Sequence, residues 1–183
     1  MPKAAGSGQL VSIDAVRGCD LVSCAKRLLQ VDGARTRDGG FSTFDASSIF
    51  FDLAGVRDTV EQPASPQTLL LLFAADLRFR LRWQIEPALA ERQTVVAAPY
   101  IETGMAFGLA FGVSRRWLTE LFRFAPKPAA SFWVDKGPSH KQSPSSGFLE
   151  FCSADLPIQE PFLSHFAAYF TELERRGKCR RLS

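Results

Sequence analysis

A glycine-containing turn between an apolar segment and a helix is the part of this chain best suited to bind phosphate. Leu10–Ile13 predicts a short strand, Gly18 a tight turn, and Val22–Leu29 a helix. In such an arrangement the free N–H groups of the first helical turn and the helix dipole both point at an anion. A working phosphate loop has the pattern G-x-x-x-x-G-K-[ST], whereas residues 15–22 here are AVRGCDLV. The sequence therefore predicts the scaffold of a phosphate loop without its chemistry.

Neither the cysteines nor the histidines form a pattern typical of a metal site. The four cysteines, at positions 19, 24, 152 and 179, include no C-x-x-C pair, and His140 and His165 are far apart. Cys19 and Cys24 flank the predicted helix start, where one thiol could be acidified. We favour the simpler interpretation, in which the cysteines are small, reduced core residues.

Length and composition indicate a single globular domain. The chain has 183 residues, of which 46% are hydrophobic and 22% are charged, as is ordinary for such a domain. A net charge of +3 does not favour a nucleic-acid partner, and no apolar run reaches the roughly 18 residues of a membrane-spanning helix. We expect a cytoplasmic protein with no membrane contact, a flexible leader at 1–9, one domain at 10–175 and a solvated basic tail at 176–183.

The other elements must position the phosphate loop. The strongest is a helix that begins at Ser65-Pro66 and runs to about Ala90, with apolar residues three and four positions apart. Pro87 is expected to end or kink it. Further helices are predicted at 43–53, 101–111, 114–124 and 160–175, strands at 94–98 and 131–134, and a loop at 136–147, while 148–151 is ambiguous. Short apolar strands between helices indicate a parallel sheet, whose ligands bind beyond the carboxyl ends of the strands.

Several blocks of sequence, in one order and at one spacing, resemble those of thymidylate kinases. They are LLLFAAD at 70–76, IEPAL at 85–89, TVVAAPYIE at 94–102 and WLTEL at 117–121, followed by Phe124-Ala125, Lys127-Pro128, Asp135 and Pro138. The resemblance implies an α/β fold of the P-loop nucleoside-monophosphate-kinase type, with three layers and a parallel sheet of about four to five strands flanked by helices. Because the chain stops soon after the last predicted helix, we expect the family's terminal strand to be absent, which would leave four strands.

Compared with this family, the phosphate loop has lost its charged and metal-binding side chains. The family's lysine, which neutralises the β- and γ-phosphates, corresponds to Leu21, and its Mg²⁺-binding hydroxyl corresponds to Val22. Asp20 adds a negative charge, and two like charges about 4 Å apart at an effective dielectric constant of about 20 repel by roughly 4 kcal/mol. The vestigial loop residues are Arg17, Gly18 and Ser23.

The acceptor side of the family's site is altered as well. The resemblance implies that Phe73 matches a phenylalanine that stacks on thymine, Tyr100 the tyrosine of an Asp-Arg-Tyr motif, and Arg37 an arginine on the acceptor phosphate. These three residues form the vestigial acceptor pocket. The lost groups are the motif's aspartate and arginine (Ala98 and Pro99), the base-reading arginine (Leu77), the base-pairing glutamine (Gly108) and the lid arginines, for which 136–147 offers only Lys136 and Lys141.

The combined losses favour a catalytically inactive thymidylate-kinase-like protein that acts through protein contacts and needs no cofactor. The alternative is a divergent dTMP or nucleoside-monophosphate kinase that uses ATP and Mg²⁺, with Arg17 as the replacement cation. A nucleotide-sensing or nucleic-acid-associated module is a third, less favoured interpretation. Since thymidylate kinases pair through their long helices, the resemblance implies a homodimer, or a heterodimer with an active kinase, through the 66–90 helix.

Overall fold

The computed structural model describes residues 8–15, 24, 40–44, 63–135, 147–153 and 155–182, and the following account concerns these residues. They contain five parallel strands in the spatial order β2-β3-β1-β4-β5. The strands are β1 (Gln9–Ala15), β2 (Phe41–Thr43), β3 (Thr94–Ala98), β4 (Ala130–Val134) and β5 (Arg180–Leu182). The predicted fold class, a parallel sheet flanked by helices, is confirmed.

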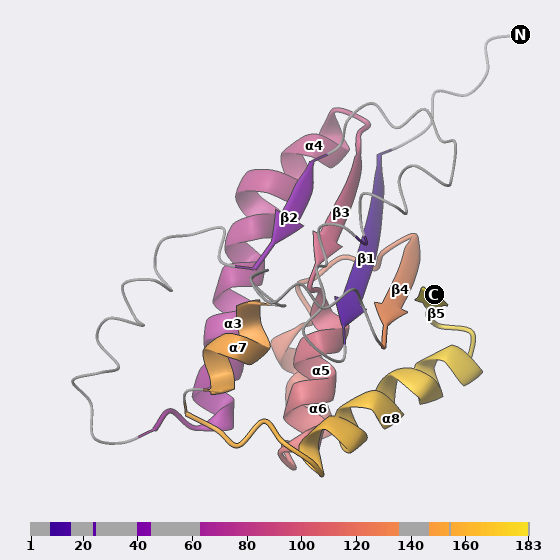
Figure 1. Ribbon diagram of the computed structural model, residues 1–183. Coiled ribbons are helices and arrows are strands. Elements are labelled where there is room, and N and C mark those ends of the chain that lie inside the picture. The colour runs from indigo at the N-terminus through magenta and orange to yellow at the C-terminus, as the bar shows by residue number, and fades with distance from the viewer. Residues whose placement is uncertain are drawn as a thin grey trace, which may run out of the picture.

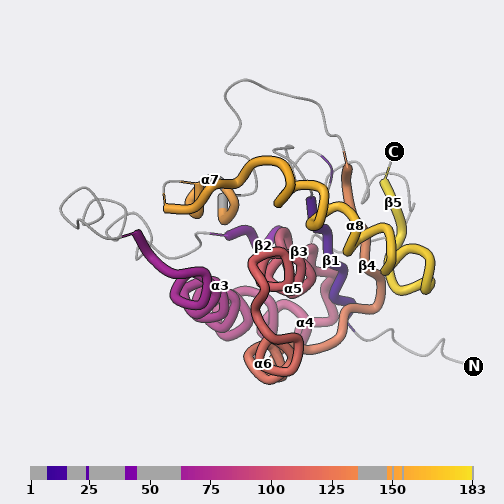
Figure 2. Tube along the Cα trace, turned by 90° about the horizontal axis from the view of Figure 1, so that it is seen from below, coloured from indigo at the N-terminus to yellow at the C-terminus, as the bar shows by residue number. Residues whose placement is uncertain are grey.

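The helices lie alongside the sheet and beyond the carboxyl ends of its strands. They are α3 (Pro66–Arg80), the π-helical segment η1 (Leu81–Ile85), α4 (Glu86–Ala90), α5 (Ile101–Ala110), α6 (Arg115–Leu121), α7 (Gly147–Ser153) and α8 (Phe162–Arg175). In Figure 1, α5, α6 and α8 lie below the arrowheads of the strands, while α3 runs beside β2. The helix α5 packs between α3 and α8 (Figure 2). The start of α5 is therefore close to the ends of several strands.

The long helix over residues 66–90 is present, as the apolar spacing predicted. Ser65 caps it, since its Oγ accepts the Thr68 N–H at 3.1 Å, and Pro66 is the first helical residue. The apolar side chains at this three- and four-residue spacing are all fully buried: Leu69, Leu70, Phe73, Leu77, Leu81 and Ile85. Pro87 does not end the helix. Just before Pro87 the chain forms a π-helical turn, in which the Glu86 N–H bonds to Leu81 O, five residues back. The wider turn accommodates Pro87, which has no backbone N–H to donate.

The two faces of the sheet bury separate sets of side chains. Successive side chains of a strand point to opposite faces, so Leu10 joins the larger cluster, with the helices α3, α5 and α8, while Val11 and Ile13 join a smaller one. Ser12 and Asp14 lie on the same face of β1 as Leu10, because they are two and four residues further along the strand, and they are also buried. A buried carboxyl group is thus placed at the end of β1, facing the helices.

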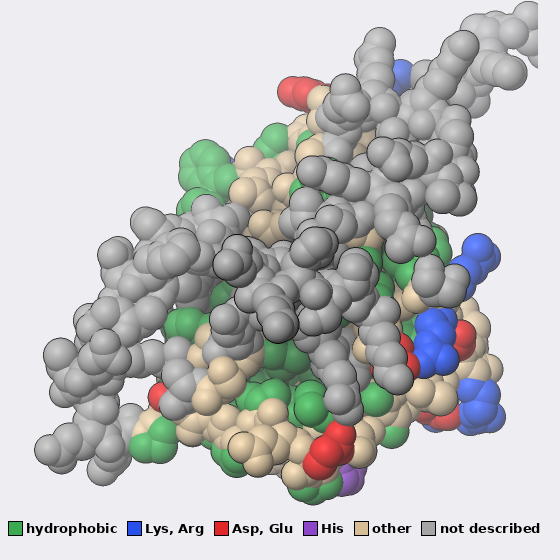
Figure 3. All heavy atoms as spheres, in the orientation of Figure 1, with side chains coloured by type: hydrophobic (Ala, Val, Ile, Leu, Met, Phe, Trp, Pro, Cys, Tyr) green, Lys and Arg blue, Asp and Glu red, His purple; other side chains and the backbone are tan. Residues whose placement is uncertain are grey.

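The C-terminal segment differs from the prediction that the terminal strand is absent. Residues Arg180–Leu182 form β5, which pairs in parallel with β4 through Phe132↔Arg180 and Val134↔Leu182. The Arg181 guanidinium lies 4.8 Å from the centre of the Trp133 ring and pairs with Asp135. Lys and Arg side chains at this end of the molecule accordingly lie beside acidic ones (Figure 3). The charge pattern alone did not indicate these partners, which are distant in the sequence.

Other differences are smaller. Phe148–Phe151, ambiguous in the sequence, belong to the helix α7. The predicted helix over 43–53 begins on β2, and its residues 45–53 lie outside the described residues, as do 136–146 of the predicted lid and 1–7 of the leader. Within the described part of the chain, no helix combines the length and apolar character needed to cross a bilayer.

Candidate functional site

The predicted site residues divide between described and undescribed parts of the chain. Arg17, Gly18, Ser23 and Arg37 lie outside the described residues, as does the rest of the phosphate loop from 16 to 23. Phe73 on α3 and Tyr100 before α5 are described, and both are fully buried. The site described below is therefore the region that the resemblance assigns to the acceptor, where β1, β2 and β3 end near α3 and α5.

The end of β1 places the carboxyl group of Asp14 at the start of α5. Its Oδ1 accepts hydrogen bonds from the Tyr100 N–H at 2.9 Å, the Thr103 N–H at 3.1 Å and the Thr103 hydroxyl at 2.6 Å. Burial raises the pKa of Asp14 from 3.8 to about 6, although these hydrogen bonds oppose the shift. Through these hydrogen bonds the carboxyl group holds the start of α5 against β1. The sequence alone did not predict this role.

A second polar feature that the sequence reading missed is the buried pair of Asp76 and Arg80 on α3. The Arg80 Nε donates to Asp76 Oδ2 at 2.7 Å, and both side chains are inaccessible to solvent. Nη1 donates to Ser42 O at 3.2 Å and to Pro99 O at 3.0 Å, which links α3 to the ends of β2 and β3. Burial lowers the pKa of Arg80, while the charge of Asp76 raises it. The four-residue spacing of an acid and a base on the apolar side of α3 was the available signal.

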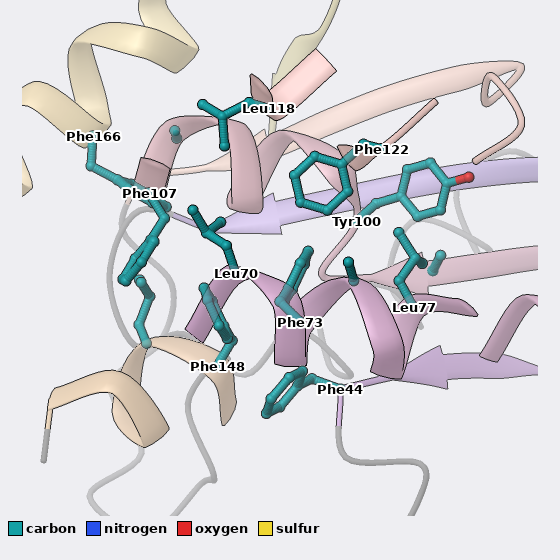
Figure 4. Close-up of a cluster of buried hydrophobic side chains, with 14 of the residues drawn as sticks. Phe44, Leu70, Phe73, Leu77, Tyr100, Phe107, Leu118, Phe122, Phe148 and Phe166 are labelled. Carbon is teal, nitrogen blue, oxygen red and sulfur yellow. The ribbon is translucent and has the colours of Figure 1, made fainter. Parts of the chain in front are cut away.

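Phe73, the residue matched to a base-stacking phenylalanine, is enclosed by other aromatic side chains. Its ring centre lies 4.5 Å from that of Phe148 on α7, 5.9 Å from that of Phe122 and 6.1 Å from that of Phe44, which is stacked on it. Figure 4 shows Phe44, Phe122 and Phe148 surrounding the ring. Phe107 extends the cluster, with its ring centre 5.0 Å from that of Phe148. In this arrangement Phe73 is a core residue, and its ring surface is covered by protein.

The position matched to the base-pairing glutamine is closed to side chains. A Cβ atom on Gly108 would lie 2.5 Å from Leu118 Cδ2 and 3.1 Å from Leu70 Cδ1. The absence of a side chain at Gly108 is what lets α5 pack closely against both α6 and α3 at this point. Leu77, matched to the base-reading arginine, is likewise fully buried. Apolar packing thus occupies the positions that the resemblance assigns to the base.

Tyr100 is held in place as a structural residue. Its hydroxyl donates to Pro126 O at 2.7 Å, and burial raises its pKa. Ala98, at the end of β3, is 2% exposed and packs in the smaller cluster beneath the sheet. Within the described ranges, no group of three or more His, Cys, Asp or Glu side chains is arranged to hold a metal ion.

Sequence comparison relates part of the chain to one group of proteins. A 74-residue segment is 36% identical to a probable thymidylate kinase of Pyrobaculum aerophilum, covering 40% of this chain and 38% of that protein. A 65-residue segment is 35% identical to a probable thymidylate kinase of Pyrococcus abyssi, covering 36% of this chain and 32% of that protein. In these matches the chain spans less than two fifths of the length of its curated relatives. No family model matches the chain.

Structural comparison extends the likeness to the whole chain. The crystal structure of thymidylate kinase from Ehrlichia chaffeensis superposes with a TM-score of 0.64, covering 97% of this chain and 93% of that one. The sequence identity over this superposition is 13%, so the likeness establishes the fold and not the activity.

Proposed function

We propose that this chain, a relative of the thymidylate kinases in sequence and in fold, is a catalytically inactive member that acts through contacts with another protein. The observation that carries the proposal is the enclosure of Phe73 by Phe44, Phe122 and Phe148. A base cannot stack on a ring whose surface is already covered. Aromatic pairs of this kind contribute about 0.5–1.5 kcal/mol each beyond their area burial, so opening the cluster for a ligand would be costly.

The closed position at Gly108 supports the same proposal. A glutamine or other hydrogen-bonding side chain there would displace Leu118, which is fully buried. Apolar groups therefore stand where a base-reading site requires polar ones. Discrimination of a base depends on hydrogen bonds to its edge, and a site without them loses most of its specificity.

The sequence of the phosphate loop and of the end of β3 adds a second, independent line of support. Leucine and valine at 21 and 22 can neither neutralise a phosphate nor ligate Mg²⁺, and alanine and proline at 98 and 99 supply no charge. Positioned cations on the transferred phosphoryl group provide most of the catalysis in this reaction class. Their joint loss, together with retained apolar packing, is the pattern expected when the fold was kept and phosphoryl transfer was not.

The exposed side of α3 and η1 is the surface that we assign to the partner. Leu71 is 54% exposed and Trp83 is 66% exposed, and they are the large hydrophobic side chains on the surface of the described chain. The rings of Phe79 and Trp83 lie 6.4 Å apart on this side. The proposed partner is a second copy of the chain or an active kinase, and the proposed contact is the 66–90 helix. Exposed aromatic side chains are typical anchors of protein interfaces.

The proposal is tested by measuring ligand-induced stabilisation and turnover on the same preparation. The melting temperature is recorded with ATP, ADP, dTMP and dTDP at millimolar concentration, each with and without Mg²⁺. We expect no shift, whereas a ligand at 100 times its dissociation constant would add about 2.7 kcal/mol to the free energy of unfolding. Phosphorylation of dTMP is then assayed in the wild type and in Arg17→Ala. Turnover that the substitution abolishes would overturn the proposal and favour the divergent ATP- and Mg²⁺-dependent kinase, since a contaminating kinase would be unaffected.

A further inference from the structure

The last strand of the described chain has one open edge. Figure 1 shows β5 at the margin of the sheet, and within the described ranges it pairs with β4 alone. No described residue outside β4 forms a backbone hydrogen bond with Arg180–Leu182. An edge strand presents a row of free N–H and C=O groups, with which another chain can pair. The edge of β5 therefore has the main-chain groups that a strand-addition site requires.

The residues around this edge carry an excess of positive charge. The basic residues are Arg175, Arg176, Lys178, Arg180 and Arg181, and the acidic residues beside them are Glu172, Glu174 and Asp135. Arg175 and Arg176 share the single carboxylate of Glu172. Arg180, on β5 itself, is exposed and has no ion-pair partner within the part of the chain that the structure describes. The charge at the edge is therefore complementary to an acidic partner.

Side-chain contacts hold β5 in place while its outer edge stays open. The Arg181 guanidinium lies 4.8 Å from the centre of the Trp133 ring and pairs with Asp135. Cys179, just before the strand, is buried, and Leu182 packs against the smaller apolar cluster. A strand that is already ordered loses little conformational entropy when a second strand pairs with it. The edge is thus a preorganised template.

Among the partners that such an edge could take, an acidic protein segment fits the charges best. Pairing with β5 of a second copy would bring arginine side chains close to one another, and like charges opposite each other on neighbouring strands are destabilising. A single-stranded nucleic acid needs exposed aromatic rings on which its bases stack. Trp133 is 1% exposed beneath Arg181, and Phe132 packs against the smaller apolar cluster.

We propose that the outer edge of β5 is a docking site for an extended, acidic segment of another protein, which adds to the sheet as a further strand beside Arg180–Leu182. Main-chain hydrogen bonds hold the added strand, and an acidic side chain opposite Arg180 sets its position. This surface is separate from the 66–90 helix. The inference therefore goes beyond the proposed function and does not depend on which protein that helix contacts.

Three short labelled peptides test the site on the full chain by fluorescence anisotropy. One alternates glutamate with valine, the second has lysine in place of glutamate, and the third is the acidic peptide with N-methyl groups on alternate amides. We expect the acidic peptide to bind saturably, and at least about tenfold more tightly than the other two. Equal binding of the acidic peptide and its N-methylated form would overturn the proposal, because charge without strand pairing would explain it. Absence of saturable binding by the acidic peptide would overturn it as well.

Hydrogen exchange locates the bound peptide, and a nucleic acid tests the other class of acidic partner. With the acidic peptide bound, we expect amide exchange to slow within residues 180–182 and to stay unchanged in α6. Unchanged exchange at 180–182 would contradict strand addition. A single-stranded oligothymidylate is titrated at the same ionic strength, and an affinity equal to or above that of the acidic peptide would overturn the assignment of a protein partner.

Matched substitutions then connect the binding to β5. Arg180→Glu should weaken binding of the acidic peptide by at least about tenfold and should strengthen binding of the lysine peptide. Arg116→Glu is the control, since Arg116 is exposed on α6 and its replacement changes the net charge by the same amount without touching the edge. If Arg180→Glu lowers the melting temperature, Arg180→Gln takes its place. Equal affinities in the wild type and the Arg180 variant, or equal losses in the Arg180 and Arg116 variants, would contradict the assignment.

Discussion

At the scale of single residues, the acceptor side of the site is organised by buried polar groups that each join two elements. Asp14 joins the end of β1 to α5, and Arg80 joins α3 to the ends of β2 and β3. Glu102 on α5 accepts the Tyr169 hydroxyl of α8. These contacts use carboxyl and guanidinium groups for positioning, at the sheet edge where a kinase of this fold would use them on its ligands. We expect each of these contacts to affect stability.

Asp14 should make the protein less stable as the pH rises from about 4 to about 6. Its folded pKa of about 6 exceeds the ordinary 3.8, so the native state holds the proton more tightly than the unfolded state. The resulting stabilisation is complete below pH 4 and is lost as the pH rises through 6, and its size is of the order of 3 kcal/mol. Urea unfolding of wild type and Asp14→Asn at pH 4, 5, 6 and 7.5 measures it.

We expect Asp14→Asn, which keeps the acceptor oxygen and cannot ionise, to remove this decline. Thr103→Val is the control, because it deletes one donor to Asp14 Oδ1 and leaves a titrating carboxyl group. It should lower stability and keep a pH dependence. Parallel stability curves for wild type and Asp14→Asn would show that Asp14 does not titrate in this range.

Gly108 provides a test of the closed base side. Gly108→Gln should lower the free energy of unfolding by about 1–3 kcal/mol, because its Cβ would overlap Leu118 Cδ2 and overpack the core. Leu118→Ala alone should cost about 2–5 kcal/mol through the cavity that it creates. The double variant should recover part of both losses, giving a favourable coupling of about 1 kcal/mol or more. Additive losses in chemical denaturation would mean that the two positions do not compete for space.

At the scale of elements, α3 and its continuation carry most of the contacts that define the site. The helix contributes Phe73 to the aromatic cluster and Arg80 to the strand ends, and its start is set by Ser65 and Pro66. Apolar spacing and the local cap were sufficient to predict this helix and its buried side. The pairing of Arg80 with Asp76 and the enclosure of Phe73 were not predictable in the same way, because they depend on which distant segments pack against the helix.

The cap of α3 can be tested against a second serine in the chain. Ser65→Ala should lower stability by about 1 kcal/mol, since it removes the acceptor of the Thr68 N–H. Ser114 precedes α6 without a capping bond from its side chain in the described structure, so Ser114→Ala should change stability by a few tenths of a kcal/mol at most. Thermal unfolding of both variants measures the two changes in stability. Equal losses of stability would contradict the assignment of Ser65 as the cap.

At the scale of the whole molecule, the described side chains bury one face of the sheet in a large apolar cluster. On the outer side of α3 and η1, by contrast, large apolar side chains are exposed to solvent. The larger apolar cluster joins α3, α5, α7 and α8 above β1, β3 and β4. Trp83 and Leu71 remain outside it. This contrast between a closed interior and an exposed apolar helix is what makes contact with another protein the proposed role.

The proposed self-association through the 66–90 helix predicts a dimer in solution. Sedimentation velocity of the wild type should give a mass near twice 20.2 kDa, and Trp83→Glu should shift it toward the monomer by placing a charge in the apolar contact. Thr171→Glu, on the exposed side of α8, is the control and should leave the dimer intact. A wild-type mass that stays monomeric at high concentration would remove the homodimer and leave a heterologous partner.

The sequence by itself determined the features that depend on near neighbours in the chain. The burial of Leu70, Phe73 and Leu77, the start of α3 at Ser65 and the parallel α/β class all follow from spacing and from local backbone chemistry. The tertiary structure alone decided the features that join distant segments. They include the bonds of Asp14 to residues 100 and 103, the packing of Phe148 on Phe73, the pairing of β5 with β4, and the bonds of Arg80 to residues 42 and 99. The physical reason is that burial, and with it the pKa and hydrogen-bond partners of a polar group, is set by the elements that cover it.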